Sequence, residues 1–245
     1  MSVDYVKEIN RLKKEKNAVI LAHYYQRPEA QDLADFLGDS LALSREAANT
    51  DADIIVFCGV HFMAETAKIL SPQKKVLLPS KNAGCPMADM ADEKGIKCYK
   101  MKHSDVKIIA YVNTTAEVKA LSDVCVTSGN AMKVVEHYKG QKLLYVPDKN
   151  LGAYLKDKYN LEMELWEGYC SVHDKVSKTD VRVMRNKYPD ALLIVHPECP
   201  LDIVKMADFI GSTKSLLEYV TESPSREFII GTEEGIIHQM KLRNP

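Results

Sequence analysis

The sequence lacks the features that mark several large protein classes. Basic and acidic residues nearly cancel, at 33 and 34, and there is no long Lys/Arg block. A dedicated nucleic-acid binder is therefore not indicated, because phosphate contacts need a concentrated positive surface. No apolar run approaches the roughly 18 to 20 residues of a membrane helix, and the amphipathic start of the chain does not resemble an export signal. We expect a globular cytoplasmic protein.

Cysteine is also sparse, and no two cysteines form a CxxC pair. This excludes a small disulfide scaffold and gives no support to a zinc ribbon or a thioredoxin-type motif. The six cysteines are Cys58, Cys85, Cys98, Cys125, Cys170 and Cys199. We expect them to be free thiols or metal ligands.

Short apolar runs alternate with segments of helical spacing along the whole chain. The runs span residues 18–23, 53–58, 75–79, 107–112, 142–147, 192–196 and 228–231. Near-continuous apolar strands separated by helices are typical of parallel sheets covered on both faces, so the sequence predicts an α/β fold.

An internal repeat organises these elements. The segments LADFLGDS (33–40), LSDVCVTS (121–128) and MADFIGST (206–213) align, and their aspartates Asp35, Asp123 and Asp208 are 88 and 85 residues apart. Polar residues recur at fixed offsets: His23, Tyr111 and His196 twelve before each Asp; Tyr25, Asn113 and Glu198 ten before; Ser40, Ser128 and Thr213 five after.

This repeat predicts three similar αβα, Rossmann-like units with parallel sheets around a pseudo-threefold axis. We expect units at residues 1–104, 105–188 and 189–245, the third incomplete. Ligands of open parallel sheets bind at the carboxyl ends of strands, where the recurring polar residues fall. A solenoid is the main alternative, but the period exceeds the about 20 to 50 residues of such arrays.

Two cysteines occupy equivalent loops of the repeat. Cys85 lies 50 residues after Asp35 and Cys170 lies 47 after Asp123, and the same offset from Asp208 falls beyond Pro245. Three converging thiolates suit an iron–sulfur cluster with one open iron position. The alternative is that both are ordinary small loop residues.

The other cysteines are expected to be inert. Cys58 and Cys125 lie in apolar strand contexts, where a buried thiol behaves as a small hydrophobe, and Cys98 lies in a charged segment without a partner thiol.

Ten segments in order resemble the quinolinate synthase family, the A protein of NAD biosynthesis. They are AHYYQ (22–26), ADFLGDS (34–40), FMAETAKIL (62–70), NAGCPMADM (82–90), YVNTTAE (111–117), CVTSGNA (125–131), PDKNLG (147–152), GYCSVH (168–173), HPECP (196–200) and GSTKSL (211–216). The resemblance implies an enzyme that condenses iminoaspartate with dihydroxyacetone phosphate to quinolinate, phosphate and two waters. It also implies a [4Fe–4S] cluster whose open iron acts as a Lewis acid.

The resemblance also implies roles for individual residues. Cys85 and Cys170 match the first two cluster ligands, and the third is expected beyond Pro245, so that the cluster would be incomplete without that segment. The implied catalytic residues are His23, Tyr25, His173, His196 and Glu198. The implied substrate-binding residues are His23, Ser40, Tyr111, Asn113, Ser128, His196, Glu198, Ser212 and Thr213.

Each role has a simpler alternative. The hydroxyl residues would otherwise be helix N-caps, and His173 would hold the cysteine loop by a hydrogen bond. For the whole chain, the alternatives are a non-catalytic small-molecule binding protein and another cluster-dependent hydro-lyase. The implied partners are the two substrates, with iminoaspartate supplied by an aspartate-oxidising enzyme, and neither nucleic acid nor membrane.

Overall fold

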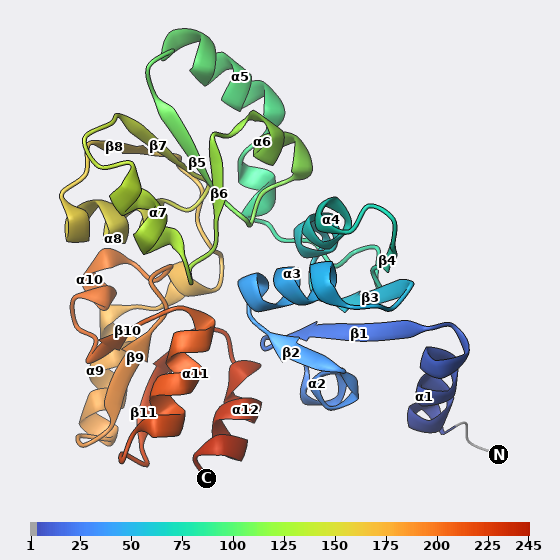
Figure 1. Ribbon diagram of the computed structural model, residues 1–245. Coiled ribbons are helices and arrows are strands. Elements are labelled where there is room, and N and C mark those ends of the chain that lie inside the picture. Colours follow the sequence, from blue (N-terminus) through green and yellow to red (C-terminus); the bar gives the residue numbers. More distant parts are fainter. Residues whose placement is uncertain (1–3) are drawn as a thin grey trace. The chain divides into compact units, whose positions relative to one another are not determined.

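A computed structural model describes residues 4–245 and confirms the α/β fold. It contains three separate parallel sheets, of four, four and three strands (Figure 1). Among residues 4–245, no helix has both the length and the apolar character needed to cross a membrane.

The first sheet has the strand order β2-β1-β3-β4. Its strands are β1 (Ala18–His23), β2 (Phe36–Gly38), β3 (Ile54–Cys58) and β4 (Lys75–Leu77), and its helices are α1 (Tyr5–Glu15), α2 (Pro28–Leu33), α3 (Ser40–Asn49) and α4 (His61–Leu70). Helices α3 and α4 cover one face, and α1 and α2 lie on the other (Figure 1). Coverage of both faces explains why β1 is apolar and buried almost throughout.

The second sheet repeats this arrangement, in the order β6-β5-β7-β8. Its strands are β5 (Lys107–Tyr111), β6 (Val124–Val126), β7 (Leu143–Val146) and β8 (Met163–Leu165), and its helices are α5 (Glu93–Lys102), α6 (Ala116–Leu121), α7 (Ala131–His137) and α8 (Lys149–Tyr159). Helix α5 contacts α6 and α7 contacts α8. Short 3-10 helices lie at Ala88–Met90 and His173–Lys175.

The third sheet has the order β10-β9-β11. Its strands are β9 (Leu192–Val195), β10 (Phe209–Ile210) and β11 (Phe228–Gly231), and its helices are α9 (Lys178–Lys187), α10 (Leu201–Val204), α11 (Thr213–Glu222) and α12 (Ile236–Arg243). All eleven strands of residues 4–245 pair in parallel, as the alternation of strands and helices predicted.

The strand pairings follow one register in the three sheets. Strands β1, β5 and β9 pair with the edge strands β2, β6 and β10 through residues 15 apart: Leu21 with Phe36, Ile109 with Val124 and Ile194 with Phe209. On their other side they pair with β3, β7 and β11 through residues 36 apart: Ala18 with Ile54, Lys107 with Leu143 and Leu192 with Phe228. The repeat found in the sequence is therefore a repeat of backbone geometry.

The three repeated aspartates hold this register. Each carboxylate accepts a hydrogen bond from the backbone N–H of a strand residue 15 positions earlier, and each aspartate donates its own N–H to the carbonyl of that residue. The pairs are Asp35 with Ile20, Asp123 with Ile108 and Asp208 with Leu193, at 2.8 to 2.9 Å. Each carboxylate also pairs with a cation: Lys13, Lys107 and Arg185, respectively.

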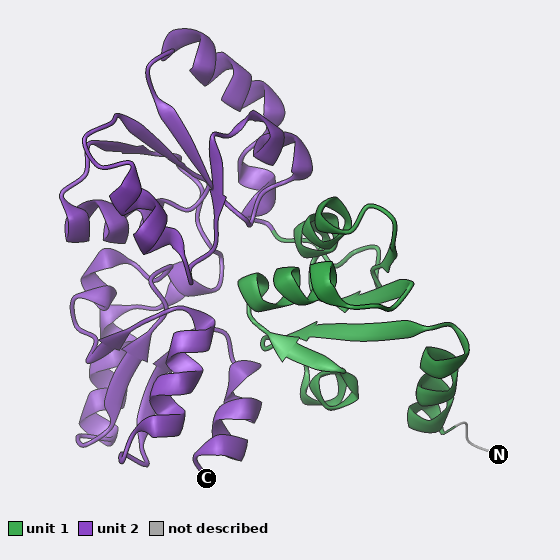
Figure 2. Ribbon diagram, in the orientation of Figure 1, with its two compact units in different colours: residues 1–85 green, residues 86–245 purple. Residues whose placement is uncertain are grey.

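The chain divides into two compact units, residues 1–85 and 86–245 (Figure 2). The first contains one sheet and the second contains the other two. The boundaries at 104/105 and 188/189 stay a prediction.

Candidate functional site

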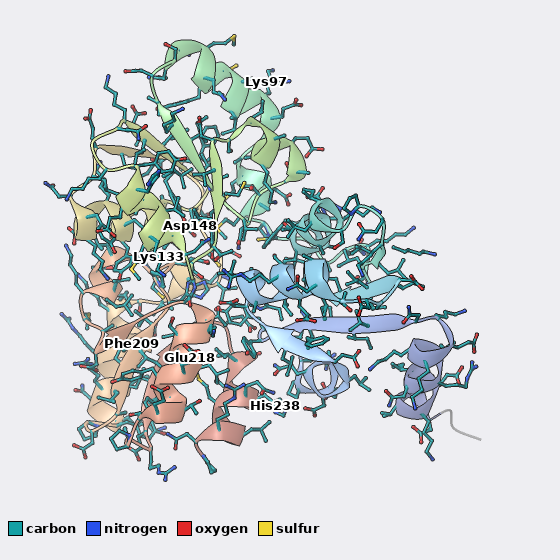
Figure 3. All side chains as sticks on the ribbon, in the orientation of Figure 1. Lys97, Lys133, Asp148, Phe209, Glu218 and His238 are labelled. Atoms are coloured by element: carbon teal, nitrogen blue, oxygen red, sulfur yellow. The ribbon has the colours of Figure 1, made fainter. Side chains whose placement is uncertain are left out.

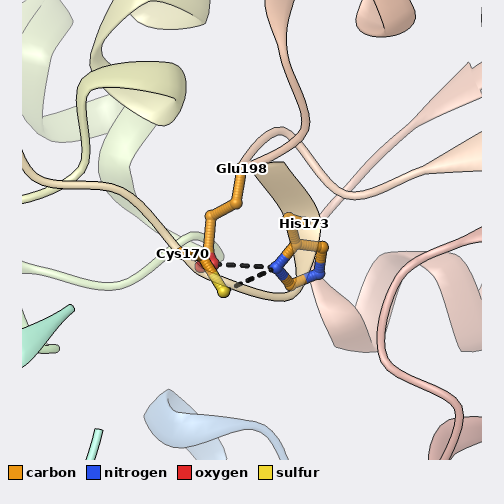
Figure 4. A group of neighbouring side chains, drawn as sticks. All are labelled: Cys170, His173 and Glu198. Carbon is orange, nitrogen blue, oxygen red and sulfur yellow. Dashed lines mark hydrogen bonds and ion pairs between the residues drawn. The ribbon is translucent and has the colours of Figure 1, made fainter. Parts of the chain in front are cut away.

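Glu198 lies at the centre of a buried polar cluster in the unit of residues 86–245. It follows β9 by three positions, and the residue is 4% exposed. The Tyr111 hydroxyl, at the end of β5, donates to Glu198 Oε1 at 2.5 Å. On the other oxygen, Oε2, Glu198 lies 3.0 Å from Nδ1 of His173 (Figure 4). Tyr111, at the end of β5, and His173, in the short helix that follows Cys170, thus orient the two oxygens of one carboxylate.

The cluster favours the ionised form of Glu198. Burial alone raises the pKa of this carboxyl group, but the imidazoles of His196 and His173 and the hydrogen bonds from His173 and Tyr111 outweigh burial and hold the pKa well below its usual range. In the opposite direction, burial and the adjacent Glu198 carboxylate raise the pKa of Tyr111 well above its ordinary value. At neutral pH the pair is therefore a carboxylate acceptor and a phenol donor.

Cys170 adjoins the same cluster through His173. Its Sγ is 3.1 Å from His173 Nδ1 (Figure 4). On the other side of the ring, His173 Nε2 is 2.8 Å from the Thr232 hydroxyl. The rings of His173 and His196 stack with their centroids 4.9 Å apart. The donor atoms of Cys170, His173 and Glu198 lie within 4.8 Å of one another, so these three residues can hold a metal ion.

The loop that carries Cys170 is fixed by a close backbone approach. A Cβ atom at Gly168 would lie 2.5 Å from the carbonyl oxygen of Pro147, so only glycine fits there. After Cys170 the chain turns into the short helix that begins at His173, and Asp174 N–H donates to the Cys170 carbonyl at 2.9 Å. Burial, followed by the Glu198 carboxylate, raises the pKa of the Cys170 thiol.

His23 and His196 share a local geometry in the two units. The N–H of Tyr25 donates to His23 Nδ1 at 3.1 Å, and the N–H of Glu198 donates to His196 Nδ1 at 3.3 Å. When Nδ1 accepts, a neutral imidazole carries its proton on Nε2. Both histidines therefore present an Nε2–H donor, which suits recognition of a carboxylate.

The hydroxyl residues of the repeat do not all occupy the same local structure. Ser40 and Thr213 are the first residues of α3 and α11, and the N-caps are Asp39 and Ser212. Ser128 instead lies in a turn before α7, which begins at Ala131, because Asn130 Oδ1 accepts the N–H of Thr127 and delays the helix.

Ser128 faces the cluster nonetheless: burial and Glu198 raise the pKa of Tyr111, and the Ser128 side chain acts on the same phenol in the opposite direction. Asn113, two residues beyond β5, is half-buried, and its side-chain oxygen has no hydrogen-bond partner among residues 4–245. A buried amide oxygen without a partner is a candidate contact for a ligand.

The candidate residues divide between the two units. Within residues 86–245, the structure brings together Tyr111, Ser128, Cys170, His173, His196 and Glu198. The unit of residues 1–85 carries His23, Tyr25, Ser40 and Cys85, and its His23 and Tyr25 rings meet edge to face at 4.6 Å.

The remaining cysteines differ in burial. Cys199 is buried, donates its Sγ–H to the Gly231 carbonyl at 3.3 Å, and has a pKa raised to about 12 by burial and by the nearby carboxyl groups of Glu198 and Asp148. The expectation that Cys125 is buried is wrong: it is exposed, because β6 is an edge strand. Cys58 is half-buried and Cys98 is exposed.

Sequence reasoning missed Thr232, which holds the far side of the His173 ring. It follows β11 directly, and extending the strand-end rule to that strand would have found it. It also missed Asp148, a fully buried carboxyl group at the start of α8. The signal there was an aspartate directly before a helical segment.

Comparison with known proteins identifies the family of this chain. The model of the family described as quinolinate synthetase A protein matches residues 7–245. A quinolinate synthase of Sulfurihydrogenibium sp. (strain YO3AOP1) is 54% identical over 243 residues, which are 99% of this chain and 79% of that protein. Quinolinate synthase of Synechocystis sp. is also 54% identical over 243 residues, 99% of this chain and 76% of the relative. Quinolinate synthase 1 of Methanosarcina acetivorans is 51% identical over 242 residues, 99% and 80% of the two chains. The three relatives are named quinolinate synthase, and the chain belongs to the quinolinate synthetase A protein family.

Proposed function

We propose that this chain condenses iminoaspartate with dihydroxyacetone phosphate to form quinolinate, with release of phosphate and two waters. The observation that carries the proposal is the buried cluster of Tyr111, Cys170, His173 and Glu198 in a chain of this family. An aspartate-oxidising enzyme would supply the iminoaspartate.

Binding of iminoaspartate is assigned to donors at the strand ends. His23 and His196 each present an Nε2–H suited to a carboxylate. Ser40 and Thr213 open helices of ten residues, where hydroxyl and backbone N–H groups favour an anion. Ser128, Ser212, Tyr111 and Asn113 complete the proposed substrate contacts.

Proton transfer is assigned to Glu198 and Tyr25, with His173 as a third participant. Glu198 is ionised at neutral pH and oriented by two donors, so it can accept a proton from a substrate carbon or nitrogen. Tyr25 follows His23 by two positions, the place that Glu198 takes after His196, which supports related roles. His173 joins Cys170 to Glu198 and can carry a proton between them.

The donor set of the cluster fits a metal cofactor. A thiol and a carboxylate lie beside one imidazole in a buried position, and burial and Glu198 both oppose the Cys170 thiolate. A bound cation removes that opposition, because a thiolate that coordinates a metal is stabilised in its deprotonated form. Cys85 and Cys170 would hold a [4Fe–4S] cluster together with a third ligand proposed beyond Pro245. The cluster supplies Lewis acidity that assists the loss of hydroxide.

Cys199 is not proposed as the third ligand. Its sulfur is buried and donates to the Gly231 carbonyl at the end of β11. This contact supports a packing role.

The test is anaerobic reconstitution of the full-length gene product with iron and sulfide. The measured quantities are iron and sulfide per chain, the charge-transfer absorption band, and quinolinate formed from the two substrates. We expect Cys85→Ala and Cys170→Ala to lose both the band and the activity, and Cys199→Ala and the exposed control Cys98→Ala to keep both. Loss of the band in Cys199→Ala alone would overturn the ligand assignment. A cluster without quinolinate formation would favour another hydro-lyase, and binding without any turnover would favour a binding protein.

A further inference from the structure

The end of β1 and the loop after it carry His23 and Tyr25, and a buried side chain of α2 holds this loop. Helix α2 packs against β1, with side chains between them (Figure 3). Gln31 of this helix is 1% exposed, and its Nε2 donates to the carbonyls of Tyr24 at 2.9 Å and Gln26 at 2.7 Å. These two carbonyls lie on either side of Tyr25. One amide group therefore brackets a candidate catalytic residue.

Three successive peptide planes around Tyr25 are each held by a hydrogen bond. Gln31 holds the first through the Tyr24 carbonyl and the third through the Gln26 carbonyl. The middle plane is held by the Gln26 N–H, which donates to the His23 carbonyl at 2.9 Å. The first plane also carries the Tyr25 N–H, which donates to His23 Nδ1 at 3.1 Å. Gln31 thus holds the plane whose N–H contacts the His23 ring.

The same position of the repeat carries a donor in the second sheet. Lys119 lies four residues before its repeated aspartate, as Gln31 does, and its Nζ donates to the carbonyl of Thr114. Thr114 takes the place of Gln26, nine residues before the aspartate. An amide in one repeat and an ammonium group in the other thus contact the equivalent backbone carbonyl. This recurrence indicates that the loop, and not only the helix, determines the residue at this position.

The third repeat has valine at this position, and its loop is held in another way. Val204 is 2% exposed, so the helix itself can pack there without a polar group. In that loop the Glu198 side chain is oriented directly, by Tyr111 and His173. A buried amide costs free energy unless its hydrogen bonds are made. The carbonyls that Gln31 contacts therefore account for its presence in the interior.

We propose that Gln31 is a positioning residue that fixes the backbone around Tyr25 and, through the Tyr25 N–H, keeps the proton of the His23 ring on Nε2. In this tautomer His23 offers a donor to a carboxylate. The contacts above carry the positioning role. Its effect on turnover rests on the proposed function, in which His23 and Tyr25 act on the substrate.

Hydrogen exchange of the Tyr25 and Gln26 amides in the metal-free protein tests the positioning role. Gln31→Met keeps the length of the side chain but removes both donated hydrogen bonds, so we expect both amides to exchange about tenfold faster or more. Gln31→Lys supplies the donor that the second sheet uses at this position. We expect it to restore most of the protection.

Lys68→Met is the matched control within the same sheet. Lys68 Nζ donates to the carbonyls of Pro72 at 2.7 Å and Lys74 at 2.8 Å, so this variant also loses two hydrogen bonds to the backbone. Lys74 precedes β4 at the amino ends of the parallel strands, whereas the loop of Tyr25 lies at their carboxyl ends. We expect Lys68→Met to leave the exchange of the Tyr25 amide unchanged.

The His23 ring gives a second measurement, which a general loss of stability would not change. At a pH at which this ring is neutral, nitrogen NMR of the unmodified protein should show an unprotonated Nδ1 and a protonated Nε2. In Gln31→Met the shifts of the two nitrogens should move toward each other, because the tautomers mix once Nδ1 loses its donor. Gln31→Lys and Lys68→Met should keep them apart. The result for the unmodified protein counts even if Gln31→Met does not fold.

Unchanged exchange of the Tyr25 amide in Gln31→Met would overturn the positioning role, as would a protonated Nδ1 in the unmodified protein or an equal response to Lys68→Met. Quinolinate formation by the reconstituted enzyme separates the two proposals. A kcat/KM that falls about tenfold in Gln31→Met and recovers in Gln31→Lys supports both. Faster amide exchange with unchanged kcat/KM retains the positioning role and contradicts the roles proposed for His23 and Tyr25.

Discussion

Removal of the Asp123 carboxylate tests whether the repeated aspartates hold the sheets in register. Asp123 Oδ2 accepts the N–H of the fully buried Ile108 at 2.9 Å, and Oδ1 pairs with Lys107 at 3.0 Å. Asp123→Ala leaves the Ile108 N–H without its acceptor. A hydrogen bond to a charged group contributes about 1.5 to 3 kcal/mol, and an exposed ion pair adds less than about 1 kcal/mol.

The local consequence is measured by hydrogen exchange of the Ile108 amide. Since about 1.4 kcal/mol corresponds to a tenfold change, we expect exchange of this amide to accelerate by about 10- to 150-fold. Asp123→Asn keeps an oxygen acceptor for the N–H and loses the ion pair, so most of the protection should remain. Asp105→Ala, which removes a fully exposed partner of Lys142, is the control and should have no effect on Ile108.

Two outcomes would refute this reasoning. An acceleration below about threefold in Asp123→Ala would mean that the carboxylate does not hold the strand. Equal effects of Asp123→Ala and Asp123→Asn would mean that the ion pair, and not the backbone hydrogen bond, is responsible.

Two further predictions concern the site. Gly168→Ala should lower the free energy of unfolding by about 1 to 3 kcal/mol in urea titrations, because the new Cβ meets the Pro147 carbonyl, whereas Gly84→Ala, with no atom within 4 Å of its Cβ, should be neutral; equal effects would contradict the close approach. The folded-state pKa of Glu198 lies below its unfolded value near 4.5, so this group contributes stability above that pH and loses it as pH falls further. Glu198→Gln should therefore show a shallower loss of thermal stability on acidification below pH 4.5 than the unmodified protein, and parallel curves would contradict the assignment.

The fold could be predicted from the sequence to a large extent because its information is local and repeated. Apolar runs marked the strands, and alignment of Asp35, Asp123 and Asp208 gave offsets that the strand register confirms. What failed was side-chain exposure: Cys125 lies in an apolar run, but that run is an edge strand, and strand order depends on tertiary structure.

The site could be predicted as a set of residues but not as a set of contacts. Repeat position singled out Tyr111 and Glu198, yet the hydrogen bond between them joins residues 87 apart, one at the end of β5 and the other in the loop after β9. The contact between Thr232 and the His173 ring likewise joins residues 59 apart in sequence, so it could not be predicted from either segment alone.

In each unit, the aspartate that holds the strand register is separate from the polar residues at the strand ends. The aspartate that joins two strands lies on a different segment from the polar residues at the strand ends, so a change at one leaves the hydrogen bonds of the other in place. Equivalent positions consequently hold His23, Tyr111 and His196, although the strand residues before them pair in the same register. A duplicated unit of this kind can diversify one strand end at a time, which is a route from three equal copies to an asymmetric site.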